Sequence, residues 1–361
     1  MIIGEKFKNA FDGRITQVFL YLTDTCNLRC RQCLYKTELT FQLSQKEIPY
    51  QDALGLMESF YNLGARKITF MGGEPTLYKK LPELVHKARQ LGYSYIRMDS
   101  NGTFNTSLLD NPYLQEIDEI TFSLDGYNEE INDSIRGKGS FYKCVHNIKK
   151  AISRGYEVHV TTCVHRGFTQ NSSSDEHLGL IEMIKFLKSL GVAKINMHDL
   201  FKSGIPRDVW SDSIDTSIEE YINAYQLVIE YKKKNKDNTI RMPQCVTTQD
   251  EFNRNPEYYG YCSVKQYDRI LAFPNGMLRV CSLMIGTPYC VGYYNSNRVY
   301  WNENPTNEIL GHEMNNNTKC TNQGKGNHFS GEYVPLCVSF KPKQDEPVWI
   351  ERLKWEQKRK D

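Results

Sequence analysis

The chain lacks a strong charge of either sign. It has 45 basic and 43 acidic residues, which gives a formal net charge of +2 over 361 residues. So small an excess produces no field that attracts a polyanion, and no nucleic-acid partner is expected. The sequence also lacks the run of roughly 20 apolar residues that a membrane span needs, and its first residues lack the apolar core of a signal peptide. We therefore expect a cytoplasmic protein with no membrane partner.

Internal repeats and low-complexity tracts are absent as well, which excludes a solenoid. A chain of 361 residues is long enough for one domain of about 200 to 250 residues with a smaller appendage. Two compact units are the starting expectation.

Cysteine is abundant, with 11 residues. Disulfides rarely persist in a reducing compartment, and an odd number of thiols fits them poorly, so metal or redox chemistry is indicated. Some of these residues can be small core hydrophobes, which is how free cysteine usually behaves. We favour that interpretation for Cys144, in an expected helix, and Cys163, in an expected strand.

Short β-rich runs alternate with amphipathic stretches up to about residue 235, which is typical of βα units around a parallel sheet. Strands are expected at 17–22, 67–70, 95–98, 119–123, 157–163 and 193–197. Helices are expected at 47–63, 80–91, 141–153, 175–190 and 217–234, with a weaker one at 106–115. A boundary is expected near 235–245, because residues 245–340 have little helical periodicity and hold six of the cysteines. A short helix is expected at 347–355.

Three cysteines follow the first expected strand: Cys26, Cys30 and Cys33 form a C-x3-C-x2-C pattern. Three thiolates at this spacing can hold one cubic iron–sulfur cluster and leave its fourth iron without a protein ligand. That open iron is a place where chemistry can occur.

Two other interpretations of this triplet are weaker. The three positions could line one buried face of a helix, but their neighbours are polar and the stripe does not continue to residues 37 and 40. Structural zinc sites pair two C-x2-4-C knuckles or add histidines. No histidine lies near this loop.

The triplet resembles the C-x3-C-x-φ-C motif of the radical S-adenosylmethionine (SAM) superfamily, which that family places after its first barrel strand. A second landmark, after the second expected strand, resembles the segment whose backbone holds the SAM amino group. It consists of Gly72, Gly73, Glu74 and Pro75. Adjacent glycines let a main chain approach a ligand closely. The resemblance covers about residues 16–235, and one departure is Gln32 at the φ position, where the family usually has an aromatic residue that contacts adenine.

Further landmarks recur in order. Ser100 and Asn101 follow the third expected strand, and Ser123 and Asp125 follow the fourth, at the edge where parallel α/β folds bind ligands. The resemblance implies that all four contact SAM, that Ser123 and Asp125 face its ribose hydroxyls and that Arg136 pairs with its carboxylate, for which a guanidinium is suited. Taken singly, each residue could instead serve a turn or a helix cap.

A second cysteine set resembles the opening hairpin of the twitch or SPASM appendage of this superfamily, which carries auxiliary clusters. Cys262 is followed by thirteen residues, Gly276, four residues and Cys281. A tight turn at Gly276 is expected to place the two cysteines side by side on neighbouring strands. The expected remaining ligands are Cys320 and Cys337, with Cys290 and Cys245 in reserve. The denser SPASM run is absent, so one auxiliary [4Fe–4S] cluster is expected; a zinc-stapled or plain hairpin is the alternative.

The resemblance implies an α/β enzyme, a partial (β/α)6 barrel with a C-terminal cysteine-rich, twitch- or SPASM-like appendage, that uses a [4Fe–4S] cluster and SAM. The expected divisions are an N-terminal segment at 1–15, the barrel at 16–240, the auxiliary domain at 241–340 and a C-terminal helix or tail at 341–361.

Family members cleave SAM to a 5′-deoxyadenosyl radical that takes hydrogen from a C–H bond. A reducing partner such as flavodoxin or ferredoxin is implied. Because twitch and SPASM members often oxidise, cross-link or epimerise peptides, a peptide is the first expected substrate. The triplet begins at residue 26, so no peptide-recognition domain is expected ahead of it. A dehydrogenase or epimerase of a sugar or aminoglycoside-like small molecule is therefore the alternative, and a non-catalytic iron–sulfur or zinc scaffold is a third.

The substrate pocket is expected at the C-terminal ends of the strands. His198 and Asp199 lie there, ahead of a loop at 200–207 that could close over a substrate. Such a pair could orient a substrate or take a proton, since histidine titrates near neutral pH. An ordinary strand-end histidine with a capping aspartate is the alternative. His165 and Arg166, after the fifth strand, are a comparable pair.

Overall fold

The computed structural model describes the central part of the chain and selected segments of the C-terminal part. The described residues are 13–33, 46–169, 179–200, 214, 216, 218–241, 246–248, 254, 261–262, 267–282, 290–302, 333–335 and 340–341. The loop expected at 200–207, apart from Leu200, and the helix expected at 347–355 lie outside them. Among the described residues, no helix combines the length and apolarity that crossing a membrane requires.

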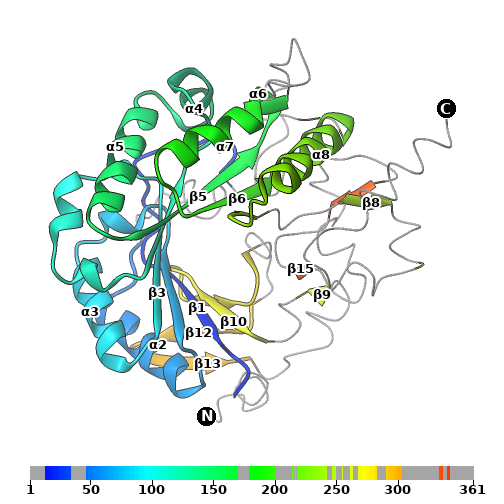
Figure 1. The fold of residues 1–361 in the computed structure, drawn as a ribbon. Coiled ribbons are helices and arrows are strands. Elements are labelled where there is room, and N and C mark those ends of the chain that lie inside the picture. The colour runs from blue at the N-terminus through cyan, green and yellow to red at the C-terminus, as the bar shows by residue number, and fades with distance from the viewer. Residues whose placement is uncertain are drawn as a thin grey trace.

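A curved parallel sheet organises the molecule, as the alternating pattern predicted (Figure 1). Each expected strand is present within a few residues, and neighbours in the sequence pair in parallel. The strands are β1 (Gln17–Tyr21), β2 (Lys67–Met71), β3 (Tyr95–Ser100), β4 (Glu119–Ser123), β5 (Glu157–Val164) and β6 (Lys194–Asp199), followed by a short β7 (Ile240–Arg241). Parallel order places all their C-terminal ends at one edge of the sheet.

Helices connect these strands and follow one another around the outside of the sheet (Figure 1). They are α2 (Tyr50–Asn62), α3 (Leu81–Leu91), α4 (Glu129–Arg136), α5 (Ser140–Ser153), α6 (Arg166–Thr169), α7 (Gly179–Ser189) and α8 (Ile218–Asn235). The weaker helix expected at 106–115 is instead two 3₁₀ turns, η3 (Thr106–Asp110) and η4 (Leu114–Glu116); a third, η2 (Pro75–Leu77), follows β2. Helix α4, which the sequence pattern did not predict, is capped by the Asn128 side chain, which accepts from the Ile131 N–H at 2.9 Å.

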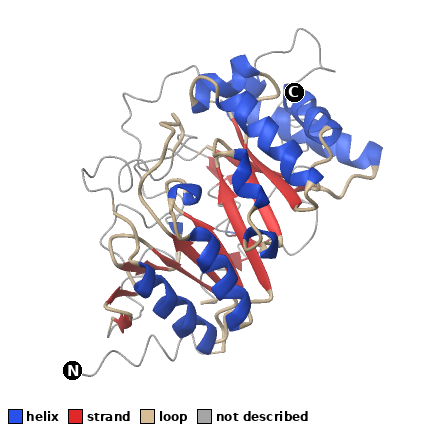
Figure 2. Ribbon diagram, turned by 90° about the vertical axis from the view of Figure 1, so that its left-hand side faces the viewer, coloured by secondary structure: helices blue, strands red, loops and turns tan. Residues whose placement is uncertain are grey.

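The core lies between the sheet and the helices, which pack along one side of the strands (Figure 2). Alternate strand residues, such as Val18, Ile68, Ile96 and Ile120, are fully buried there. Since side chains alternate across a strand, the intervening residues lie on the opposite, concave face. On β3 to β6 these residues are largely polar, whereas a parallel sheet covered on both faces reads as a nearly continuous apolar run.

The C-terminal part extends this same sheet. Strand β10 (Arg269–Ala272) pairs in parallel with β1, and β11 (Met277–Arg279), β12 (Gly292–Asn295) and β13 (Arg298–Trp301) follow in antiparallel order. In the described part of the chain the sheet has eleven strands. Residues 267–302 therefore continue the sheet of the expected barrel.

Two short ladders hold other C-terminal segments. One joins β8 (Val246–Thr248) to β14 (Tyr333–Pro335), and the other joins β9 (Tyr261–Cys262) to β15 (Phe340–Lys341). The hairpin that turns at Gly276, with φ 87°, is built from β10 and β11, and β10 begins seven residues after Cys262. The expectation that Cys262 and Cys281 lie on its two neighbouring strands is therefore wrong: Cys262 pairs with Phe340.

The β12–β13 hairpin also rests on α2. The N–H of Asn297 donates to Asp52 Oδ1 at 2.6 Å, and Gly55 faces Asn297 so closely that a Cβ there would lie 2.9 Å from the Asn297 carbonyl oxygen. Trp301 contacts Phe60 edge to face, with ring centroids 6.4 Å apart. These contacts fix the C-terminal strands against the first helix of the barrel.

Candidate active site

The cysteine loop, residues 22–33, leaves the C-terminal end of β1 and is anchored to the glycine turn after β2. The N–H of Gly73 donates to the carbonyl oxygen of Thr23 at 2.7 Å, and that of Glu74 donates to Thr25 at 2.9 Å. A Cβ on Gly73 would lie only 2.3 Å from the Thr25 carbonyl oxygen, and one on Gly72 would lie 2.5 Å from that of Thr23. The two glycines are thus needed for the turn to pack against the cysteine loop.

The three thiols of this loop are half-buried and interact with one another. Burial raises the pKa of Cys26, and it raises that of Cys30 to about 12, with Cys33 adding to both shifts. Cys26 Sγ accepts from the Leu28 N–H at 3.4 Å and from Asn101 Nδ2 at 3.7 Å. Without a cation Cys26 and Cys30 are neutral thiols, and bound iron would favour the thiolates.

The donor set fits an iron–sulfur cluster. In the part of the chain that is described, no three His, Cys, Asp or Glu side chains are placed to hold a single metal ion. A cubic cluster is different, because each cysteine binds its own iron. Three thiols on one accessible loop, sharing an electrostatic environment, suit that arrangement better than a single zinc ion. The assignment of Cys26, Cys30 and Cys33 as ligands of the cluster stays a prediction that this donor set fits.

Glu74 links the glycine turn to the end of β3 and is 1% exposed. Its Oε1 accepts from the hydroxyls of Thr76 and Ser100 at 2.6 and 2.7 Å, and its Oε2 accepts from the Asn101 N–H at 2.8 Å. Burial raises the pKa of Glu74, and these hydrogen bonds oppose the shift. Glu74, Ser100 and Asn101 are thus brought together beside Cys26, and their contact with SAM stays a prediction.

Asp125 is the centre of a second group of polar contacts, next to Gln32 near the C-terminal end of the cysteine loop. Its Oδ2 lies 2.6 Å from Arg136 Nε and accepts from Gln32 Nε2 at 2.5 Å, while its Oδ1 accepts from the Cys163 N–H at 2.7 Å. The side chain is 0% exposed. Gln32, which departs from the family pattern, is therefore a hydrogen-bond donor to Asp125. The ribose contact remains a prediction better suited to half-buried Ser123, since protein donors already occupy both Asp125 oxygens.

Arg136 also lies near the cysteine loop. Its carbonyl oxygen accepts from the Cys30 thiol at 3.8 Å, and the Arg31 N–H donates to the carbonyl of Ile135 at 2.9 Å. Burial alone would lower the pKa of Arg136, but Asp125 raises it above its ordinary value. The guanidinium is thus a permanent cation close to Cys30, and pairing with a carboxylate of the cofactor remains a prediction.

His165 has a structural position. Its Nε2 lies 2.7 Å from the Asp125 carbonyl oxygen, and its Nδ1 accepts from the Gly167 N–H at 3.1 Å. The ring is 1% exposed, and burial lowers its pKa. Both nitrogens are used within the protein. Arg166 lies beside it and donates its main-chain N–H to Ile214.

His198 lies at the end of β6 on the concave face, in register with Cys163 of β5. Its side chain is partly exposed. Burial and the nearby charge of Arg97 lower the pKa of His198 to about 4, so the imidazole is neutral at physiological pH. The backbone of Asp199 ends the same strand, and its side chain lies outside the described residues.

A polar network on the concave face was not anticipated. Arg97 Nη2 donates to Asp99 Oδ2 at 2.9 Å and its Nε lies 3.3 Å from Glu119 Oε1, while His159 Nδ1 lies 2.9 Å from the same Glu119 oxygen. Burial would raise the pKa of Glu119, but His159 and Arg97 outweigh it and lower the pKa. The sequence does carry a signal for this network, because polar residues alternate with apolar ones within strands that were expected to be buried.

The remaining cysteines are less completely placed. Cys281 is 3% exposed and belongs to the core cluster, while half-buried Cys290 accepts from Asn302 Nδ2 at 3.5 Å. Cys245, Cys320, Cys337 and the side chain of Cys262 lie outside the described residues. Cys144 is buried, which confirms the core interpretation, whereas Cys163 is only half-buried.

Comparison with known proteins agrees with this geometry. Residues 20–173 match the model of the Radical SAM superfamily. These residues form a Radical SAM domain, so the chain is a radical SAM enzyme; such enzymes use a [4Fe–4S] cluster and S-adenosylmethionine. The SPASM-like nature of the C-terminal part remains a prediction.

Similar sequences include a "Probable GTP 3',8-cyclase" of Saccharolobus islandicus (strain M.14.25 / Kamchatka #1), which is 29% identical over 224 residues, 62% of this chain and 68% of that one. The "Probable GTP 3',8-cyclase" of Sulfolobus acidocaldarius is 24% identical over 277 residues, 76% of this chain and 83% of that one.

Solved structures with a similar fold include Streptococcus suis SuiB bound to its precursor peptide SuiA, with a TM-score of 0.63, 16% identity, and coverage of 85% of this chain and 69% of that one. In the S-adenosylmethionine complex of SuiB, the match spans 66% of that chain, slightly less than two thirds. Native anSMEcpe with AdoMet and the Kp18Cys peptide has a TM-score of 0.60 at 15% identity, covering 83% of this chain and 82% of that one.

Proposed function

We propose that this enzyme abstracts hydrogen from a C–H bond of a peptide and thereby oxidises, cross-links or epimerises it. The observation that carries the proposal is the three-thiol loop after β1, held against the Gly72–Gly73 turn at the C-terminal edge of a parallel sheet. When bound, the cluster and SAM supply a 5′-deoxyadenosyl radical.

The residues of the chain would bind and orient the cofactors. In this proposal Cys26, Cys30 and Cys33 hold the cluster, and the glycine turn and Arg136 receive the amino and carboxylate groups of SAM. Asn101 donates to Cys26 Sγ at 3.7 Å, which favours the thiolate over the thiol. The Asp125 ion pair fixes the Arg136 guanidinium, so that little rotamer entropy is lost when a ligand binds.

Two features of the concave face support a peptide substrate. First, several cations on the described part of this face are already paired: Arg97 with Asp99, Lys194 with Glu157 at 3.5 Å, and Arg269 with Asp268 at 3.0 Å. Paired cations offer little to a triphosphate, which needs charge-assisted hydrogen bonds from available donors.

Second, an apolar patch lies on this face at β1 and β10. Tyr21 stacks on Phe273 with ring centroids 4.2 Å apart, and Leu271, Phe19 and Met71 pack around them. Tyr21, Leu271 and Phe273 are buried, whereas Phe19 and Met71 at the edge of the patch are partly exposed. With the polar residues of the same face, these two side chains suit the mixed side chains of a peptide. SuiB and anSMEcpe, which share the fold, have been solved with peptides bound.

A nucleotide is the second candidate substrate. Its support is the similarity to relatives named probable GTP 3',8-cyclases, which extends over 62% of this chain. An enzyme of that kind would act on GTP in place of a peptide. The sugar-like substrates named as an alternative from the sequence have no comparable support.

We also infer an auxiliary cluster in the C-terminal part, with a revised ligand order. Pro335 pairs with Val246, and Phe340 pairs with Cys262. Cys245 precedes Val246 directly, and Cys337 lies between Pro335 and Phe340 in the sequence. This favours Cys337 and Cys245 over Cys320 as partners of Cys262, while Cys281 is buried in the core.

The test uses anaerobically reconstituted enzyme with dithionite and SAM. We expect 5′-deoxyadenosine from the wild type and none from a variant with Ala at Cys26, Cys30 and Cys33. Cys144→Ala, which removes a buried thiol outside the triplet, is the matched control and should retain the activity. Cleavage of SAM by the triple variant would contradict the proposed cluster site.

The substrate is tested by adding peptide libraries or GTP and detecting mass changes. A shift of a peptide mass by loss of hydrogen, with GTP unchanged, supports the peptide proposal. If GTP is converted and no peptide changes in mass, the peptide proposal is wrong and a nucleotide is the substrate. For the auxiliary site, the triple variant should still bind about four irons, and adding Cys262→Ala should remove them; zinc in their place, or no metal, would refute that cluster.

A further inference from the structure

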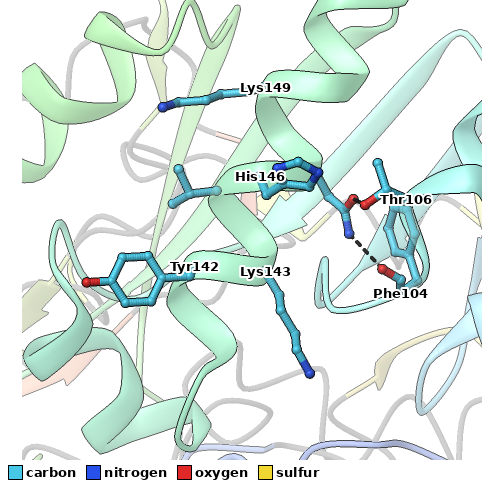
Figure 3. A pocket seen from close by; sticks show the side chains of 8 residues that line it. Phe104, Thr106, Tyr142, Lys143, His146 and Lys149 are labelled. Carbon is cyan, nitrogen blue, oxygen red and sulfur yellow. Dashed lines mark hydrogen bonds between the residues drawn. The ribbon is translucent and has the colours of Figure 1, made fainter.

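A groove of about 500 Å³ lies beside α5, on the outer side of the barrel (Figure 3). One wall is formed by α5, with Tyr142, Lys143, His146 and Lys149, and the other by Phe104 and Thr106 at the start of η3. The Tyr142 side chain is 63% exposed. The proposed activity does not use this surface, and aromatic residues at such positions are frequent anchors of protein interfaces.

The groove carries positive charge. Helix α5 contains three lysines and no acidic residue. Lys150 lies 3.5 Å from Asp110, but the exposed Lys143 and Lys149 have no ion pair with any described residue. Figure 3 shows both side chains extending from the helix, with the His146 ring facing Thr106. Unpaired cations of this kind complement an acidic surface and accelerate its encounter.

The groove also adjoins the cysteine loop. Asn147, which lines the groove, donates through Nδ2 to the carbonyl oxygens of Gly102 and Phe104, both at 2.9 Å. Asn101, the residue directly before Gly102, donates through Nδ2 to Cys26 Sγ at 3.7 Å. A single hydrogen-bonded loop, residues 101–104, therefore separates the groove from the first proposed cluster ligand.

We propose that this groove docks an acidic one-electron carrier protein of the flavodoxin or ferredoxin class. The inference rests on the proposed function, because it assumes a cluster at Cys26, Cys30 and Cys33. In the transfer the reduced carrier loses one electron and the cluster gains it, with no covalent bond formed or broken. The open groove, its two lysines without an ion pair to a described residue, and the single loop between the groove and Cys26 favour a protein that must approach the cluster from outside the barrel.

The test compares two variants with the same change of charge. Lys143→Glu/Lys149→Glu reverses the groove, and Lys79→Glu/Lys87→Glu reverses two exposed lysines near and on α3 that also have no ion pair with a described residue. Binding of oxidised flavodoxin to each reconstituted enzyme is measured by surface plasmon resonance. Measurements are made at low ionic strength and at about 1 M salt, where the Debye length falls to about 3 Å.

We expect the groove variant to bind flavodoxin at least about tenfold more weakly at low salt and the control about as well as the wild type, with the difference lost at high salt. Flavodoxin hydroquinone should then support SAM cleavage poorly in the groove variant alone, whereas dithionite should support it equally in all three proteins. Equal flavodoxin affinity in the groove variant and the control would overturn the docking proposal. Weaker binding of an acidic peptide by the groove variant, with its flavodoxin binding unchanged, would also overturn the docking proposal.

The dithionite measurement separates this inference from the function on which it rests. If the wild type cleaves no SAM with dithionite, the proposed function fails. If dithionite supports cleavage and the groove variant still binds flavodoxin normally, only the docking surface is wrong.

Discussion

Arg136 and Asp125 form an ion pair with Nε 2.6 Å from Oδ2, and their side chains are 10% and 0% exposed. The pair connects the end of α4 to the residues after β4. It also lies next to the cysteine loop, because Gln32 donates to the same Asp125 oxygen and Cys30 donates to the Arg136 carbonyl. A change at Asp125 should therefore affect both the stability of the fold and the loop that holds the proposed cluster.

Asp125→Asn should lower the free energy of unfolding by about 3–5 kcal/mol, because it leaves a buried guanidinium without a counter-charge. The control is Asp110→Asn: Asp110 pairs with Arg154, their side chains are 42% and 46% exposed, and such pairs contribute about 1 kcal/mol or less. Urea unfolding measures both. Similar losses in the two variants would show that burial of the pair has no energetic consequence.

Glu119→Gln should remove a pH-dependent contribution to stability. The pKa of Glu119 is below its ordinary value of 4.5 in the folded protein, so its contribution is complete above pH 4.5 and is lost as the pH falls below it. We expect a deficit of about 1–3 kcal/mol at pH 7 that shrinks on acidification. Unfolding curves at pH 7 and pH 4 test this, with Glu182→Gln at an exposed pair as the control. A deficit that is unchanged at pH 4 would contradict the assigned pKa shift.

Gly73→Ala should disturb the cysteine loop. The new Cβ would lie 2.3 Å from the Thr25 carbonyl oxygen, and backbone atoms on both sides leave no flexible side chain to move away. We expect lower iron content after reconstitution, with the far-ultraviolet circular dichroism unchanged. Gly155→Ala meets nothing within 4 Å although its φ is +85°, so it should cost about 1–2 kcal/mol of strain and retain full iron. Equal iron content in both variants would argue against this packing.

His198→Gln should leave substrate-independent SAM cleavage intact while lowering product formation, if the residue contacts the substrate. Asp199→Asn is expected to behave in the same way. Because the pKa of His198 is lowered to about 4, its neutral form persists from pH 8 to pH 5, and it should add no inflection to the pH profile of product formation there. Undiminished product from both variants would assign the pair to structure.

Local sequence pattern was sufficient to predict the barrel strands and the position of the cysteine loop after the first of them. Strands such as β1 and β4 are short apolar runs between turns, and the triplet at Cys26, Cys30 and Cys33 needs only spacing to be recognised. Helix α4 was missed because Glu129–Arg136 spans eight residues with only two isoleucines, Ile131 and Ile135, to mark its buried face.

Long-range pairing could not be predicted in the same way. Nothing in the sequence near Cys262 specifies that it pairs with Phe340, and hairpin geometry alone suggested Cys281. Strand partners depend on packing across the whole sheet, which local periodicity does not record. The Arg97–Glu119–His159 network was missed for a related reason: its members come from three strands, and only their register brings them together.

The pairing of β1 with β10 has a consequence for how the protein is made. Gln17 is in register with Arg269, so one edge of the first strand stays unpaired until the ribosome has synthesised more than two thirds of the chain. Contacts of such sequence separation form slowly, and an open strand edge invites pairing with other chains. The cysteine loop begins directly after that strand, so the nascent protein displays these three thiols beside an uncovered edge throughout most of translation.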